Sequence, residues 1–169
     1  MNKVLIIDTS MLCCWLQVPG KETCGTTEDQ WDFQRVNHEI QEEIAAGSTL
    51  VLPLATIIET GNHIAQANGD RFSIAQQLAA LMNDAADMRS PWAAFTDQSV
   101  LWEKEGLKRL AEELPQMATQ KISIGDVTIK TVADHYAKIG SQVEIFTGDA
   151  GLKSYQPSIP IPQPRRRKK

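Results

Sequence analysis

The chain has 169 residues, of which 42% are hydrophobic and 22% are charged, and its formal net charge is −4. This length favours one domain with a substantial core, and the composition excludes fibrous and disordered proteins. No apolar run approaches the ~20 residues that cross a bilayer, and the three cysteines, Cys13, Cys14 and Cys24, do not suit a secreted disulfide scaffold. We therefore expect a cytoplasmic protein.

The charge is unevenly distributed along the chain. Five of the 17 Lys and Arg residues form the segment 165–169, which leaves 12 against 21 Asp and Glu residues in the rest of the chain. Because this basic end follows the proline-rich stretch PSIPIPQP, we expect a domain over residues 1–156 and a disordered tail over 157–169. The tail either binds phosphates without regard to sequence or is an inert solvated end.

The first half of the chain alternates between apolar runs and helical patterns. VLIID (4–8) predicts a buried strand, and 26–47 predicts a helix that Thr26 and Thr27 cap. STLVLP (48–53) predicts a second short strand that ends at a proline, and 55–69 predicts the helix after it.

The second half continues with helices and returns to a strand. Residues 70–88, 96–114 and 123–140 each have apolar residues at helical spacing, and QVEIFTGD (142–149) predicts the third strand. Strands separated by helices indicate an α/β fold, and we expect a three-layer α/β/α sandwich with a mainly parallel central sheet.

Four acids stand near the ends of these elements. Asp8 ends the first strand, Asp149 ends the third, Glu59 lies one turn into the helix after the second strand, and Asp126 begins the last long helix. Ligands of parallel α/β sheets bind outside the carboxyl ends of the strands, so the four carboxylates can converge on one pocket. Taken singly, each acid is equally typical of a helix end, a turn or a solvated surface.

Four segments resemble, in order, the acidic motifs of the PIN-domain nucleases: VLIIDTSML, VLPLATIIETGNHI, SIGDVTIKTVADHYAKIG and EIFTGDAGL. The resemblance spans nearly the whole chain and implies a PIN-like, metal-dependent endoribonuclease. It implies that the catalytic acids and metal ligands are Asp8, Glu59, Asp126 and Asp149. The small hydroxyl positions beside them are then Thr9, Ser10 and Thr147, which we expect to contribute to substrate binding.

The stretch between Glu59 and Asp126 is longer than a minimal family member needs. It holds two predicted helices, which we interpret as an added cap or an interface. The apolar residues Ile74, Leu78, Leu81 and Met82 of the first helix fit either a homodimer or partner contact or an ordinary core face.

Three further side chains are candidates for contacting substrate. Asn62 and His63 follow Glu59 by three and four residues and share its helical face. His63 either contacts a phosphate or packs as an ordinary histidine. Lys130, four residues after Asp126, either contacts the scissile phosphate or pairs with Asp126.

Carboxylates together with hydroxyls favour a hard divalent cation, Mg²⁺ or Mn²⁺, whereas zinc prefers His and Cys ligands. Ser10 stands where a haloacid-dehalogenase-like phosphatase needs a second Asp, and no glycine-rich nucleotide-binding turn follows the first strand. The remaining alternative is a non-catalytic PIN-like module that binds RNA or a protein partner. The resemblance also leaves the role open between the toxin of a toxin–antitoxin pair, with an antitoxin protein as partner, and a free-standing nuclease.

Overall fold

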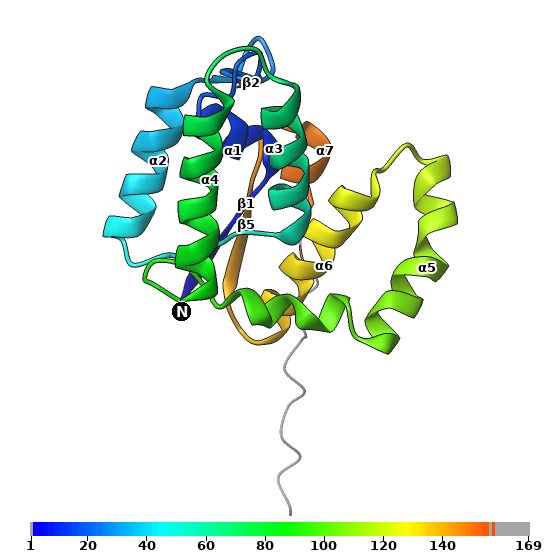
Figure 1. The fold of residues 1–169 in the computed structure, drawn as a ribbon. Helices are drawn as coiled ribbons and strands as arrows, with labels where there is room; N and C mark the ends of the chain where they lie inside the picture. Colours follow the sequence, from blue (N-terminus) through cyan, green and yellow to red (C-terminus); the bar gives the residue numbers. More distant parts are fainter. Residues whose placement is uncertain (1, 156, 158–169) are drawn as a thin grey trace, which may run out of the picture.

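The computed structural model describes residues 2–155 and 157, and its centre is a three-stranded parallel sheet (Figure 1). The strands are β1 (Lys3–Ile7), β4 (Thr49–Val51) and β5 (Gln142–Phe146), in the order β4-β1-β5. Val4 aligns with Thr49 on one side and with Val143 on the other. The four apolar residues of β1 are at most 1% exposed, which confirms the prediction of a strand buried on both faces.

Helices cover both faces of the sheet, and each face has its own apolar core. Leu5 and Ile7 of β1 pack with one group of helices, whereas Val4 and Ile6 pack with the other. The first group is α1 (Thr9–Trp15), α2 (Phe33–Ala45), α3 (Leu54–Gln66) and α4 (Arg71–Ala86). The second group is α6 (Ile124–Lys138), the 3₁₀ helix η1 (Phe95–Leu101) and α7 (Ala150–Lys153). The α/β architecture with a parallel sheet flanked by helices is therefore confirmed.

The chain between β1 and α2 differs from the prediction. A short helix, α1, follows Asp8 directly, in a stretch for which we predicted no helix, and a hairpin of β2 (Cys24–Gly25) and β3 (Gln30–Trp31) occupies the start of the predicted 26–47 helix. Asp32, not Thr26 or Thr27, caps α2, because its carboxylate accepts a hydrogen bond from the Arg35 amide at 2.9 Å. The Thr26 hydroxyl instead accepts from the Asp29 amide within the hairpin turn.

The predicted helix over 96–114 is two elements, η1 and α5 (Lys104–Thr119). Gln98 explains the break, because its side chain donates to the carbonyl of Leu52 at 2.8 Å and accepts from the amide of Leu54 at 3.1 Å. This contact ties η1 to the β4–α3 junction, and α5 then leaves in a new direction. Figure 1 shows α5 on the outer side of α6, away from the sheet.

The two helices between Glu59 and Asp126 have different positions. Ile74 and Leu78 of α4 are buried in the core and Leu81 is partly buried against it, whereas Met82 is 40% exposed, so this face apart from Met82 is a core face. Leu110 is the buried residue of α5, which therefore contributes little to the core. The prediction of an added cap therefore applies to α5 and not to α4.

None of the helices within 2–155 has the length and apolar character needed to span a membrane. The predicted tail, 157–169, lies outside the described residues apart from Pro157, as does Gln156 at the end of the predicted domain.

Candidate active site

The four predicted acids line one cavity of about 340 Å³ at the carboxyl end of the sheet. Asp8 follows β1, Asp149 follows β5, Glu59 is on α3, and Asp126 is in the first turn of α6. Parallel strands deliver their carboxyl ends to the same edge, which explains why residues 141 positions apart in sequence, Asp8 and Asp149, meet here. The expected convergence is therefore present in the fold.

Two hydroxyl groups hold the Asp8 carboxylate. Ser10 Oγ and Thr147 Oγ1 donate to Asp8 Oδ2 at 2.9 and 2.7 Å. The same hydroxyls accept from backbone amides after β5, Ser10 from Gly148 at 3.0 Å and Thr147 from Asp149 at 3.0 Å. Because each hydroxyl donates to Asp8 and accepts from the β5–α7 junction, together they fix the carboxylate relative to both strands.

A third hydroxyl and a glycine place Glu59. Thr9 Oγ1 donates to Glu59 Oε2 at 2.8 Å, which links α1 to α3. The other carboxylate oxygen lies against Gly125 of α6, where a Cβ atom would clash with Glu59 Oε1. Gly125 therefore allows the carboxylate to reach the amino end of α6, a role that the sequence did not indicate.

The electrostatics of the cavity are most evident at Asp126. Partial burial raises the pKa of this carboxyl, and the negative charges of Asp8 and Asp149 raise the pKa further. The hydroxyl of Ser123, which accepts from the Asp126 amide at 3.0 Å, lowers it in part. Within residues 2–155, none of the four acids takes part in an ion pair. The carboxylates thus repel one another, and no ion pair within the described residues neutralises any of them.

The donor atoms suit a hard divalent cation, because carboxylate and hydroxyl oxygens are the ligands that Mg²⁺ and Mn²⁺ prefer. In the described part of the chain, however, no three Asp, Glu, His or Cys side chains are grouped closely enough to hold an ion as they stand. The acids line the same cavity but would have to approach one another to bind one cation together.

Two cysteines also line the cavity, Cys13 and Cys24. Burial raises the pKa of Cys13 to about 11 and also raises that of Cys24. Both are therefore mainly protonated thiols at neutral pH, which is unsuitable for a nucleophile.

The structure separates the three candidate substrate contacts. His63 lines the cavity, whereas the Asn62 side chain is exposed and does not belong to the lining. Lys130 does not line it either, because its ammonium group lies 5.3 Å from the ring centre of Tyr155 in another pocket. The predicted pairing with Asp126 is absent among the described ion pairs, so neither suggested role of Lys130 fits its position.

One basic residue that the sequence did not single out lines the cavity, Lys21 in the loop between α1 and β2. No motif surrounds Lys21 in the sequence, so its position at the cavity is known only from the path of this loop in the structure.

Comparison of the chain with protein-family models, with curated proteins and with solved structures gives no match. The functional interpretation therefore depends on the geometry of the cavity and on the four segments that resemble PIN-domain motifs.

Proposed function

We propose that this protein is a metal-dependent endoribonuclease of the PIN type, which hydrolyses phosphodiester bonds in RNA with Mg²⁺ or Mn²⁺. The observation that carries the proposal is that Asp8, Glu59, Asp126 and Asp149 line one cavity and that, within residues 2–155, none of them takes part in an ion pair. A site that only stabilised the fold would gain nothing from four acids that repel one another.

The residues of the cavity have distinct tasks in this proposal. Asp8 and Asp149 hold the principal cation, and Glu59 and Asp126 complete or position a second site. When bound, the cation stabilises the negative charge that develops on the phosphoryl oxygens and supplies the nucleophile from water. Ser10 and Thr147 keep Asp8 in one orientation through the hydrogen bonds described above.

Two groups at the cavity are suited to the substrate phosphate. The Lys21 ammonium group can pair with a phosphate, and the His63 imidazole can donate a hydrogen bond to a phosphate oxygen. Neither residue is needed to hold the cation. They replace Asn62 and Lys130 as the candidates for substrate contact.

The test is cleavage of single-stranded RNA by the parent protein and by Asp8→Asn, each with Mg²⁺, with Mn²⁺ and with chelator. We expect cleavage by the parent with either cation, none in chelator, and a loss of at least about 10²-fold in the variant, whose amide cannot offer the same charge. Undiminished cleavage in chelator or by Asp8→Asn would contradict the mechanism.

The second candidate is a non-catalytic PIN-like module that binds RNA or a protein partner. It is favoured by the absence, in residues 2–155 and 157, of a preformed group of three ligands. The same assay separates the two candidates. A binding module would bind RNA or no nucleic acid, but it would not cleave RNA with either cation.

The biological role follows from the resemblance alone and is part of the proposal. As the toxin of a toxin–antitoxin pair, the protein would have an antitoxin whose basic side chain enters the acidic cavity. A free-standing cytoplasmic nuclease would have the same site. Copurification with the product of a neighbouring reading frame distinguishes the two.

A further inference from the structure

An apolar groove of about 150 Å³ adjoins the acidic cavity. It lies between α3 and α6, which pack against each other, and it ends at the junction of η1 and α5 (Figure 1). Its lining includes Leu54, Ile58, Trp102 and Ile124, together with Glu59 and Gly125. Glu59 lines both the groove and the cavity, so the two are adjacent.

Three large apolar side chains are exposed at this groove. Ile58 is 53% exposed, Trp102 is 44% exposed and Ile124 is 51% exposed. Trp102 lies in the break between η1 and α5, directly after the last residue of η1 and before Glu103, the N-cap residue of α5. A face with an exposed indole and two exposed isoleucines beside a reactive cavity is typical of a binding surface.

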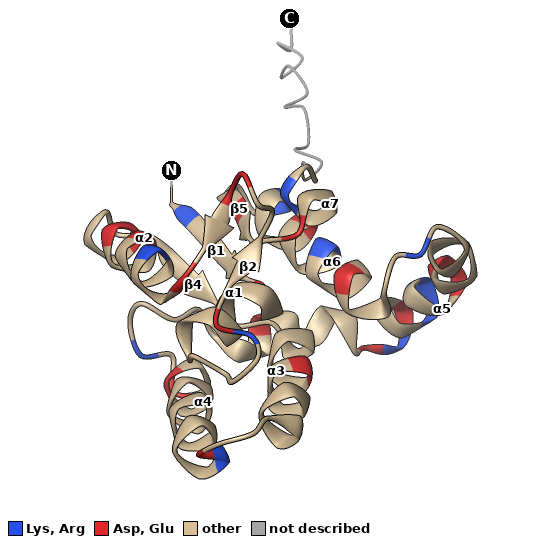
Figure 2. Ribbon diagram, turned by 90° about the horizontal axis from the view of Figure 1, so that it is seen from above, with Lys and Arg blue, Asp and Glu red and all other residues tan. Residues whose placement is uncertain are grey.

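The charges around the site indicate what can bind in the groove. No Lys or Arg belongs to its lining, so it offers nothing to a phosphate group. Residues 1–164 contain 12 basic and 21 acidic residues, and α3 carries one acid, Glu59, but no Lys or Arg, as the red and absent blue on this helix in Figure 2 show. Any contribution that the groove makes to RNA affinity through these described residues therefore does not depend on charge. Stacking of a nucleobase on an aromatic ring supplies such a contribution.

We infer that the groove binds one unpaired nucleobase of the substrate RNA, stacked on Trp102 and flanked by Ile58 and Ile124, next to the phosphate at the acidic cavity. The inference rests on the proposed ribonuclease function and specifies its substrate as single-stranded at this position. A base within a duplex is stacked and paired, so its face is not free to contact Trp102. The groove thus selects unpaired RNA without reading a particular base.

The test measures RNA binding by the full chain with the Asp8→Asn substitution, so that the RNA stays intact. Short single-stranded RNA is titrated with and without an abasic nucleotide at each position in turn, in Mg²⁺, and binding is followed by anisotropy of a labelled RNA. Trp102→Ala is expected to weaken binding about 5- to 150-fold, and Trp102→Phe much less, because a phenyl ring still stacks. The matched control is Phe72→Ala, an exposed aromatic residue on α4 outside the groove, which should leave affinity unchanged.

With an abasic nucleotide at one position of the RNA, the Asp8→Asn protein should have the same affinity with and without Trp102→Ala, since the base that stacks on Trp102 is then missing. If Trp102→Ala fails to fold, Ile58→Ser on the opposite wall is expected to weaken binding in the same base-dependent way. Equal affinity of Trp102→Ala and Phe72→Ala would overturn the inference, and so would a loss that persists with every abasic RNA or an Asp8→Asn protein that binds no RNA.

Sedimentation of the same proteins tests whether the groove instead binds a second copy of the chain. A change of the parent from dimer to monomer on Trp102→Ala, without an effect on RNA binding, would assign the groove to a second copy and overturn the inference. The two proposals fail separately. Parent cleavage that is independent of Trp102 rejects only the base site, whereas base-dependent binding without cleavage rejects only the nuclease.

Discussion

The buried acids at the two ends of the central strand β1 have different hydrogen-bond and charge partners. At the amino end, Glu43 is 9% exposed, and it accepts from the ammonium group of Lys3 and from the hydroxyl of Ser48. At the carboxyl end, Asp8 is 6% exposed and accepts from hydroxyls alone. The two carboxylates are about equally buried, but only the first has a positive charge beside it.

The pKa values follow this difference. Burial raises the pKa of Glu43, but the hydrogen bonds from Lys3 and Ser48 outweigh it and lower the pKa overall. At the other end, burial and the neighbouring acids raise the pKa of Asp126. The buried acid at the amino end is thus compensated by an ion pair, whereas the acids of the cavity have no ion-pair partner within residues 2–155.

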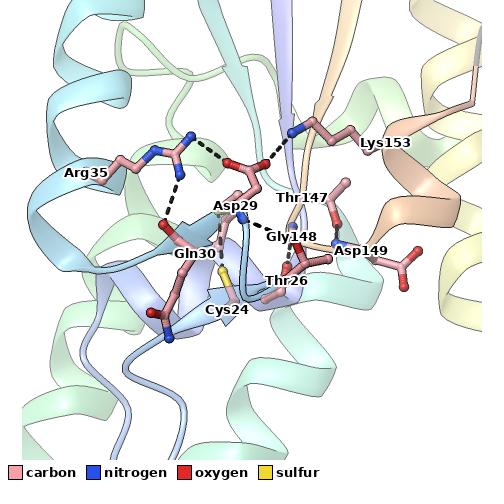
Figure 3. Close-up of polar contacts among 11 residues, drawn as sticks. Cys24, Thr26, Asp29, Gln30, Arg35, Thr147, Gly148, Asp149 and Lys153 are labelled. Atoms are coloured by element: carbon pink, nitrogen blue, oxygen red, sulfur yellow. Dashed lines mark hydrogen bonds and ion pairs between the residues drawn. The ribbon is translucent and has the colours of Figure 1, made fainter.

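Figure 3 shows the same contrast within a few residues of β5. The Asp29 carboxylate lies between Arg35 and Lys153 at 2.8 Å from each, and this pairing closes the β2–β3 hairpin onto α2 and α7. The Asp149 carboxylate points away from both cations. Arg35 and Lys153 therefore pair with the acid of the hairpin and not with Asp149.

Gly125→Ala is expected to have the largest effect on cleavage, because it disturbs the acids at the carboxyl end of β1 without changing any charge. The added methyl group displaces the Glu59 carboxylate, which is the mobile end of a side chain, so activity should fall by up to about 10²-fold. Alanine also favours the helix by about 0.5–1 kcal/mol, so the melting temperature should not fall. The measurement is RNA cleavage together with thermal unfolding, and unchanged cleavage would contradict the placing of Glu59 in the site.

Deletion of residues 165–169 removes five positive charges from a chain whose remainder is acidic. If the tail contacts phosphates, the slope of log affinity against log salt for single-stranded RNA should decrease by up to about 3.5. Binding measured from 50 to 200 mM salt checks this, with a variant that replaces the five residues by serine as a control for length. Identical slopes would assign the tail no part in binding.

Lys3→Met tests the amino end of β1. It leaves Glu43 buried with only Ser48 as a partner, and since Lys3 is partly exposed we expect a loss of about 1–3 kcal/mol in the free energy of unfolding. Cleavage by the folded variant should be unchanged. The matched control, Glu144→Gln, removes the exposed partner of the same lysine and should cost less than about 1 kcal/mol. Similar losses in the two variants would remove the distinction between the acids.

The pH dependence of stability should differ in sign between the two ends. The lowered pKa of Glu43 contributes stability above its unfolded pKa, and this stability is lost as the pH falls through the folded value. The raised pKa of Asp126 has the opposite effect, because the folded state binds the proton more tightly and stability falls as the pH rises above the ordinary Asp value of about 3.8. Unfolding of Asp126→Asn and Glu43→Gln against the parent from pH 3 to 8 in chelator checks both signs. Asp126→Asn should gain on the parent as the pH rises, and Glu43→Gln should lose. A constant difference for either variant would contradict its assigned shift.

The sequence predicted the elements whose patterns are local. The apolar run of β1 and the helical spacing in α3, α4 and α6 suffice to place them. Helix α1 was missed because most of its residues are buried, so it has no polar face to create a period. The hairpin and the η1–α5 break depend on partners far along the chain, Lys153 for Asp29 and Leu52 for Gln98, which no local pattern contains.

The candidate site follows the same division. Acids at strand ends could be predicted, because parallel strands bring their carboxyl ends together. Lys130 was placed by its spacing from Asp126, but its side chain lies over Tyr155 instead. Gly125, Lys21 and Trp102 could not be found, since their importance arises from tertiary contacts with Glu59, the cavity and α3.

The most direct test of a cation site shared by the four acids is thermal unfolding of the parent and of Asp126→Asn in chelator and in excess Mg²⁺ at neutral pH. In chelator the variant should melt about 2–4 °C higher, the shift that ~1 kcal/mol produces in a protein of this size, because one of the repelling charges is removed. Mg²⁺ should then stabilise the parent more than the variant, since a cation that binds only the folded site adds its binding free energy to stability. Glu112→Gln, an exposed acid on α5, should show neither effect. An Asp126→Asn protein that is no more stable than the parent in chelator, and that gains as much from Mg²⁺, would contradict a shared cation site.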